Sequence, residues 1–130
     1  MRYLLDTHAL AWAVSDPGRL SDEARALLRN PGNALLLSPA SIWEMSIKHR
    51  AGKWPEVAPF MDEAHYARFS RRLGARELCI SSAHARLAGG FSVAHKDPFD
   101  RLLAAQSMLE GVALISKDAA LDAFPITRLW

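Results

Sequence analysis

Four carboxylate residues stand where they could act together on a bound ligand. Three follow a short apolar run or open a helix, and the fourth lies within an apolar helical stripe; they are Asp6, Asp100, Asp118 and Glu44. The carboxyl ends of parallel strands lie along one edge of a sheet, where ligands bind in α/β folds, so we expect Asp6 and Asp118 to share that edge. Taken singly, each aspartate could instead be an ordinary helix N-cap.

These four acids could converge in one pocket only if a cation offset their mutual repulsion. A divalent metal ion would do so, and ligation by oxygen alone favours Mg²⁺ or Mn²⁺ over zinc. Such ions bind substrate phosphates and lower the pKa of a bound water. The acids therefore predict hydrolysis of phosphodiesters, with metal-held water attacking in line with the leaving 3′-oxygen and leaving a 5′-phosphate. Their spacing leaves open whether one ion or two take part.

Glu44 is the acid that is hardest to explain as a structural residue. On a helix predicted over residues 39–51, a rotation of about 100° per residue places Glu44 among Trp43, Ile47 and other apolar side chains on one face. A carboxylate that points toward the core is costly unless it is paired or coordinated. We therefore expect Glu44 to be a metal ligand, with a buried salt bridge or a side chain that reaches the rim as the alternatives.

The third acid comes from a helix start. Asp97 precedes Pro98, which favours Asp97 as the N-cap and Pro98 as the first helical residue. Asp100 lies one turn inward, where it can project into a pocket while the positive end of the helix tempers its charge. This position favours Asp100 over Asp97 as the functional acid, although Asp97 stays an alternative. Arg101 could pair with a site carboxylate or a phosphate, or make a structural pairing.

The elements that must position these acids alternate between short apolar runs and longer helical patterns, which indicates an α/β fold. Strands are predicted at residues 3–5, 34–37, 77–80, 112–115 and 126–129. Helices are predicted at residues 7–14, 22–30, 39–51, 59–73, 82–87 and 98–110, with a short one after Asp118. We expect a central, mostly parallel sheet of about four to five strands flanked by helices.

The composition predicts one domain over residues 1–130. The chain has one cysteine, Cys79, so an internal disulfide is impossible and zinc-finger spacing is absent, which suits a reducing compartment. The first residues form an apolar run too short for a signal peptide or a membrane span, so we expect a cytoplasmic protein without membrane attachment.

The charge hints at a polyanionic partner. Formal charge is only +2, but 12 of the 16 cationic residues are Arg, whose planar fork suits phosphate. Arg68, Arg71, Arg72 and Arg76 form the first candidate track for RNA phosphates, with a solvated helix face as the alternative. Trp12, Trp43, Trp54 and Phe60 could be core residues or could line an exposed apolar groove.

Four stretches of the chain resemble the PIN-domain proteins, and specifically the VapC-type toxins of bacterial type II toxin–antitoxin pairs. The stretches are Leu4–Leu10, Ser38–Glu44, His95–Gln106 and Leu114–Asp118, and their order and spacing run through nearly the whole chain. Each motif alone is weak, but four in register within an α/β pattern of this length are specific.

The resemblance implies a role for each acid. The four acids of the family match Asp6, Glu44, Asp100 and Asp118, and Ser116 stands where the family carries Ser or Thr near the metal pocket. It implies a three-layer fold, a ribonuclease dependent on Mg²⁺ or Mn²⁺ that acts as a toxin, a homodimer, and a small antitoxin protein that occupies the site. Thr7, Arg101 and Ser116 are the expected supporting or substrate-binding residues.

Two other functions remain as alternatives. A catalytically silent RNA-binding or scaffold module on the same fold would have no need to retain all four acids. A structure-specific DNA nuclease would use the same residues, but such relatives carry large insertions for which 130 residues leave no room. His8 could touch a phosphate, although a histidine satisfied by a neighbour on its helix face is favoured.

Overall fold

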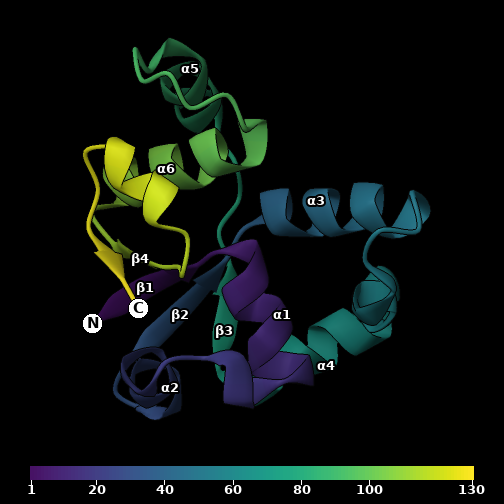
Figure 1. Ribbon diagram of the computed structural model, residues 1–130. Helices are drawn as coiled ribbons and strands as arrows, with labels where there is room; N and C mark the ends of the chain where they lie inside the picture. Colours follow the sequence, from purple (N-terminus) through teal and green to yellow (C-terminus); the bar gives the residue numbers. More distant parts are fainter.

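Five parallel strands form one sheet in the middle of the molecule (Figure 1), in a computed structural model that describes all residues, 1–130. The strands are β1 (Arg2–Leu5), β2 (Ala34–Leu37), β3 (Ala75–Glu77), β4 (Ala113–Ile115) and β5 (Arg128–Leu129). Their order across the sheet is β3-β2-β1-β4-β5, and every pairing is parallel. The prediction of a mostly parallel sheet of four to five strands is confirmed.

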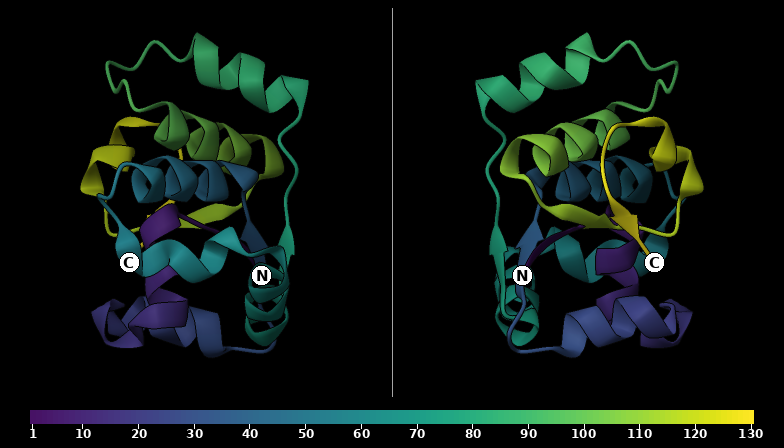
Figure 2. Two further views of the ribbon diagram at one scale, coloured as in Figure 1. Left: turned by 90° about the vertical axis from the view of Figure 1, so that its right-hand side faces the viewer. Right: turned by 90° about the vertical axis from the view of Figure 1, so that its left-hand side faces the viewer.

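The helices form layers on both faces of this sheet. They are α1 (Thr7–Ser15), α2 (Asp22–Arg29), α3 (Pro39–Arg50), α4 (Glu63–Leu73), α5 (Ser82–Gly90) and α6 (Pro98–Glu110). Three 3₁₀ segments complete the chain: η1 (Pro17–Arg19), η2 (Pro55–Met61) and η3 (Ala119–Ala123). In both views of Figure 2, α5 is the outermost helix and lies over α6.

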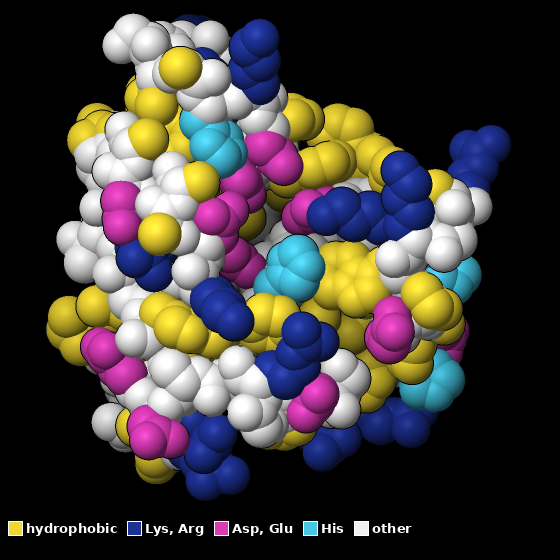
Figure 3. Space-filling model, in the orientation of Figure 1, with side chains coloured by type: hydrophobic (Ala, Val, Ile, Leu, Met, Phe, Trp, Pro, Cys, Tyr) yellow, Lys and Arg dark blue, Asp and Glu magenta, His cyan; other side chains and the backbone are white.

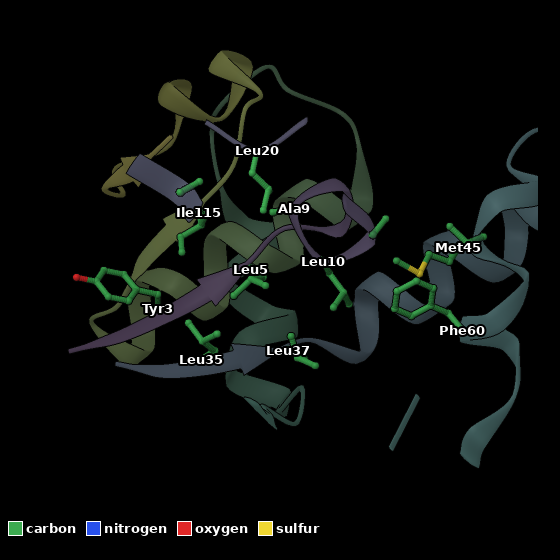
Figure 4. Packing of buried hydrophobic residues seen from close by; sticks show 13 residues of the cluster. Tyr3, Leu5, Ala9, Leu10, Leu20, Leu35, Leu37, Met45, Phe60 and Ile115 are labelled. Atoms are coloured by element: carbon green, nitrogen blue, oxygen red, sulfur yellow. The ribbon is translucent and has the colours of Figure 1, made fainter. Parts of the chain in front are cut away.

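Alternate residues of β1 divide the core into two clusters. Tyr3 and Leu5 join a cluster with Leu10 of α1 and with residues of β2 and α3, part of which is shown in Figure 4. Leu4 points to the opposite face and packs with Leu103 of α6. Because both faces of the sheet are covered, its inner strands β1, β2 and β4 are largely apolar runs, as expected for a buried parallel sheet. The three-layer α/β fold is therefore confirmed.

Several predicted boundaries are wrong. Helix α5 runs to Gly90 instead of residue 87, and β5 begins at Arg128 instead of residue 126. The third strand was expected at residues 77–80, but β3 ends at Glu77, and only the N–H of Leu78 still donates to the carbonyl of Leu37 (2.7 Å). The neighbouring strand β2 ends at Leu37, so β3 has no partner to pair with farther along. The helix predicted at residues 59–73 is split into η2 and α4, because Pro59 lies in the first part and lacks an N–H for an α-helical hydrogen bond.

The helix starts that carry the acids are formed as predicted. Ser38 caps α3 by accepting from the N–H of Ala40 (3.1 Å), and Asp97 caps α6 by accepting from the N–H groups of Phe99 and Asp100. Gly111 ends α6 with φ 63°, a left-handed conformation that favours glycine. No helix of the structure has both the length and the apolar character that a membrane crossing requires.

Candidate functional site

A cavity of about 140 Å³ lies at the carboxyl edge of the sheet, and none of its lining residues is apolar. It is lined by Asp6, Thr7, His8, Glu44, Lys48, Asp97, Asp100 and Asp118. All four predicted acids, together with Asp97, thus face one space, although they come from four separate parts of the chain. Figure 3 shows Asp and Glu side chains gathered around a hollow in this face of the molecule.

Asp6 is held at the junction of β1 and α1. Its Oδ1 accepts from the N–H groups of His8 (2.7 Å) and Ala9 (3.2 Å), and its Oδ2 accepts from the hydroxyl of Ser116. The residue is 6% exposed. Burial raises the pKa of the Asp6 carboxyl, and these hydrogen bonds oppose that rise. The carboxylate is therefore fixed in place, and burial destabilises its ionised form.

Ser116 connects Asp6 with Asp118. Ser116 follows β4 and is fully buried, and its Oγ also accepts from the N–H of Asp118 (3.0 Å). Asp118 in turn caps η3 by accepting from the N–H of Ala120 (2.9 Å), and its side chain is exposed at the cavity. Asp6 and Asp118 are thus helix N-caps, which was the alternative interpretation of the sequence. Both carboxylates nevertheless face the cavity.

Thr7 links α1, which follows Asp6, to α3, which carries Glu44. Its hydroxyl donates to Oγ of Ser41 on α3 (3.1 Å), and both residues are buried. The contact ties the first turn of α1 to the first turn of α3. The separation of Asp6 from Glu44 is thereby restrained.

Glu44 is buried, as expected, and is paired with a lysine of its own helix. Its side chain is 8% exposed, and Oε2 accepts from Nζ of Lys48 at 2.7 Å. This is the salt-bridge alternative of the sequence interpretation. Lys48 also lines the cavity and is its one permanent cation. The spacing of four residues between Glu44 and Lys48 is a signal that could have predicted the pair.

The apolar face predicted for α3 is wrong. Trp43 is 53% exposed and Ile47 is 48% exposed. The buried side of the helix instead carries Ala40, Ser41, Glu44 and Met45. Figure 1 shows α3 extending beyond the edge of the sheet, and the helix is covered where it packs against α1, α6 and η2.

Asp100 is the more buried of the two aspartates at the start of α6. Its Oδ2 lies 2.8 Å from Nε2 of His95, and its side chain is 16% exposed. Burial raises the pKa of Asp100 to about 6; His95 opposes this shift, while the charges of Asp97 and Asp6 add to it. Asp97 caps the helix through Oδ1 and also lines the cavity, so both aspartates lie at the site.

Sequence patterns did not single out His95. It belongs to a loop that Arg101 holds through five carbonyl groups, those of Ala88, Gly89, Phe91, Val93 and His95. The guanidinium of Arg101 has no carboxylate partner. Arg101 therefore makes structural contacts, which was one of the two alternatives considered from the sequence. Its effect on the site runs through His95, whose ring position it restrains.

The aromatic residues do not form the single groove considered from the sequence. Phe60 is buried in the core, and Trp43 packs edge-on against Phe99. Trp54 stacks on His8 with ring centroids 4.5 Å apart, so His8 has the satisfied neighbour that the sequence favoured. Trp12 lies next to His8 at 5.4 Å.

The arginine track of α4 lies away from the acids. Arg71 and Arg72 line a larger cavity of about 630 Å³ together with Arg25 and Arg29 of α2. None of the five cavity acids borders this space. The larger cavity is basic and contains no Asp, Glu or His, unlike the smaller one.

The donor set of the acid cavity suits a hard divalent cation. Five carboxylates face it against one lysine. Burial is the main cause that raises the pKa of Asp6 and of Asp100, and the charges of Asp97 and Asp6 add to the rise at Asp100. Oxygen donors of this kind are those that Mg²⁺ and Mn²⁺ prefer. As the side chains stand, no three of them are close enough together to form a finished metal site.

One relative by sequence is Ribonuclease VapC16 of Mycobacterium tuberculosis (strain ATCC 25618 / H37Rv). The two are 36% identical over 63 residues, a stretch that covers 48% of this chain and 43% of the relative. The aligned part therefore spans less than half of either protein.

Solved structures with the same fold cover almost the whole chain. VapBC2 from Rickettsia felis, solved bound to a DNA fragment from its promoter, has a TM-score of 0.69 and 15% identity, and the match covers 99% of this chain and 98% of the other. Mycobacterium tuberculosis VapC20, described as a sarcin–ricin loop cleaving toxin, has a TM-score of 0.63 and 15% identity, with 96% of each chain covered. At such identities these likenesses establish the fold.

The match to a family model agrees with the fold. The model that matches is that of the PIN domain, and the match runs over residues 3–126, from β1 to the segment before β5. This range includes every residue of the acid cavity. The chain therefore belongs to the PIN-domain family.

Proposed function

We propose that this protein is a metal-dependent endoribonuclease and the toxin of a type II toxin–antitoxin pair. The observation that carries the catalytic part is that Asp6, Glu44, Asp100 and Asp118, which come from four separate elements, line one cavity at the carboxyl edge of the sheet. Mutually repelling carboxylates are kept together in a fold at a cost in stability, which a bound divalent cation would offset.

These four residues would hold Mg²⁺ or Mn²⁺. When bound, such an ion supplies a Lewis acid for the phosphate and a water of lowered pKa. The chain contributes positioning: backbone N–H groups and Ser116 fix the orientation of the Asp6 carboxylate, and His95 fixes that of Asp100. Thr7 restrains α1 against α3, which keeps Glu44 opposite Asp6.

The identity of the substrate rests on relatives. Ribonuclease VapC16 and the sarcin–ricin loop cleaving toxin VapC20 are named for action on RNA. Several similar structures are toxin–antitoxin complexes, among them one from Klebsiella pneumoniae. An RNA substrate, an antitoxin protein partner, a homodimer and a cytoplasmic location all belong to the same proposal.

The ion pair of Glu44 with Lys48 favours a second candidate, a catalytically silent RNA-binding or scaffold module. At 2.7 Å the lysine satisfies Glu44 without any metal. Lys48 is however half-exposed, with 40% of its side chain accessible, so it can swing away when a divalent ion competes for the same carboxylate.

The test is cleavage of a single-stranded RNA by purified protein freed of any partner, with Mn²⁺ or Mg²⁺ and then with EDTA. We expect cleavage with metal, none with EDTA, and a loss of at least about 100-fold in rate for Asp6→Asn. Asp22→Asn, a fully exposed acid on α2, is the matched control and should cleave at the wild-type rate. Cleavage that persists in EDTA, or in Asp6→Asn, contradicts the proposal; RNA binding without cleavage favours the silent module.

The toxin role has its own test in cells. Strong expression of the wild-type chain should arrest growth, and expression of Asp6→Asn should not. A small neighbouring gene should relieve the arrest. Normal growth with wild-type protein confirmed as present and active on RNA contradicts the toxin role and leaves the nuclease proposal standing.

A further inference from the structure

Beside the acid cavity lies a second hollow of about 380 Å³ with a different lining. It is bordered by Asp6, His8, Trp12, Arg19, Trp54, Lys117 and Asp118. Three of these residues, Asp6, His8 and Asp118, also border the acid cavity, so the two hollows adjoin each other. We call the rings of His8, Trp12 and Trp54 the aromatic platform.

The rings of the aromatic platform contact one another and are partly exposed. His8 is stacked on Trp54 with an interplanar angle of 24°, and it is tilted by 57° against Trp12 at 5.4 Å. His8 is exposed, and the two tryptophans are only half-buried. Rings needed solely for the core would be covered, as Phe60 is.

Cations surround the platform. Cζ of Arg19 lies 4.7 Å from the ring centroid of Trp12, and Nζ of Lys117 lies 5.8 Å from the same centroid. Nζ of Lys48 lies 5.5 Å from the centroid of Trp54. Neither Arg19 nor Lys117 forms an ion pair with a carboxylate. Both charges are therefore available to an anionic ligand.

Single-stranded nucleic acid is bound by two features together, accessible aromatic rings and nearby cations. Bases stack on the rings, and phosphates contact the cations. The exposed Trp43 offers a contrast, because it packs against Phe99 and has no cation over its ring. Bases in a duplex are already stacked on one another and cannot reach such rings. The lining thus favours an unpaired strand.

We propose that the aromatic platform is a base-binding subsite for single-stranded RNA. A base next to the cleaved bond stacks on the rings, and Arg19 and Lys117 contact the flanking phosphates. Because the two hollows share Asp6, His8 and Asp118, a base on the platform lies beside the carboxylates that would act on the phosphodiester. This inference rests on the proposed function and adds to it the conformation of the substrate and the residues that select it.

Tryptophan fluorescence provides a direct test. The variant Trp43→Phe with Trp130→Phe leaves Trp12 and Trp54 as the only two reporters. In EDTA and at low salt, so that no strand is cut, a 12-residue oligouridylate should quench this fluorescence. An abasic ribose–phosphate strand of the same length should bind about five- to 100-fold more weakly, the range expected when a stacked base is lost. Equal affinity for the two strands overturns the proposal.

Substitutions separate ring from charge. Trp12→Ala and Trp54→Ala should each lower affinity about five- to 100-fold, and Trp12→Phe and Trp54→Phe should restore most of it because a ring remains. Since Trp12 and Trp54 also pack on the core, each variant is checked by thermal melting. Arg19→Gln and Lys117→Gln, on exposed residues, should each flatten the dependence of affinity on salt. Arg29→Gln, which removes the same charge from the distant basic cavity, is the control and should not.

The outcomes distinguish this inference from the proposed function. Wild-type cleavage with Mn²⁺ by Trp12→Ala and Trp54→Ala, without any change in KM, overturns the subsite and leaves the nuclease intact. Base-dependent quenching by a protein that never cleaves RNA supports the subsite and overturns the nuclease. Equal binding of a blunt RNA duplex and the single strand overturns the assignment to an unpaired base.

Discussion

Ser116 and Asp6 lie 110 residues apart in the chain, yet the hydroxyl of Ser116 donates to Oδ2 of Asp6 and accepts from the N–H of Asp118. One buried hydroxyl thus sets the orientation of one acid and the start of the turn that presents another. This relationship joins the ends of β1 and β4, which are neighbours in the sheet.

Removing this hydroxyl should weaken the site without abolishing it. Ser116→Ala takes away a hydrogen bond that lowers the pKa of Asp6, so that pKa should rise further. We expect Mn²⁺ affinity to fall about tenfold or more, because loss of a group that orients a metal ligand typically lowers metal affinity by that factor. The free energy of unfolding should fall by about 1–2 kcal/mol. Calorimetric titration with Mn²⁺ and urea unfolding measure the two effects. Ser116→Thr keeps the hydroxyl and should retain most of the affinity; equal losses for Thr and Ala would contradict the orienting role.

The ionised carboxylate of Asp100 should lower the stability of the folded protein at neutral pH. Its pKa is about 6 in the folded protein against an ordinary value of 3.8, so the folded state holds the proton more tightly. As pH rises from about 4 to about 6, the unfolded chain loses this proton first, and the stability of the fold decreases; above pH 6 the full cost is present. Asp100→Asn should therefore raise metal-free stability by roughly 2 kcal/mol at pH 7.5.

The check is the difference in melting temperature between Asp100→Asn and wild type in EDTA, followed from pH 4.5 to pH 7.5. The difference should be small at the acid end, grow as the pH approaches about 6, and level off at higher pH. Added Mg²⁺ should stabilise the wild type and have less effect on the variant, because the variant lacks one proposed ligand. A difference independent of pH would contradict the burial of an ionised carboxylate at this position.

Lys48 should be needed by the metal-free protein more than by the metal-bound one. Lys48→Met leaves the Glu44 carboxylate buried without its partner, which should lower metal-free stability by about 1–2 kcal/mol, a figure reduced because Lys48 is half-exposed. Saturating Mn²⁺ should recover that loss if Glu44 is a ligand. Thermal melts with and without Mn²⁺ measure both. The double variant Glu44→Gln with Lys48→Met should recover stability without metal, and failure of Mn²⁺ to rescue Lys48→Met would show that Glu44 serves only the ion pair.

Arg101 should act through the loop that it holds. Arg101→Lys cannot reproduce five hydrogen bonds to carbonyls between Ala88 and His95, so we expect a loss of about 2–4 kcal/mol and faster amide exchange over residues 88–96. Arg86→Lys, at an exposed position of α5, is the matched control and should change neither quantity by much. Unchanged exchange in Arg101→Lys would mean that the loop is held by other contacts, such as the packing of Phe91 on Phe124.

Much of this molecule follows from local sequence. An apolar run that ends at Asp6, a Ser-Pro start at Ser38 and an Asp-Pro start at Asp97 specify strand ends and helix starts, because caps and φ restrictions act within a few residues. These signals were enough to predict the parallel sheet and the position of Asp6, Asp100 and Asp118 at one cavity. The catalytic role of the four acids stays a prediction.

Only the tertiary structure decided which side of each element is covered and by what. The helical spacing of α3 fits two different faces, and the packing against α1, α6 and η2 selects the one that buries Glu44 and leaves Trp43 half-exposed. The rings of His95, Trp12 and Trp54 also pack against Phe124, Trp130 and His8, respectively, and each of these partners is far away in the chain. Periodicity describes a single element, whereas burial and charge pairing depend on its neighbours, and those are set when the layers pack together.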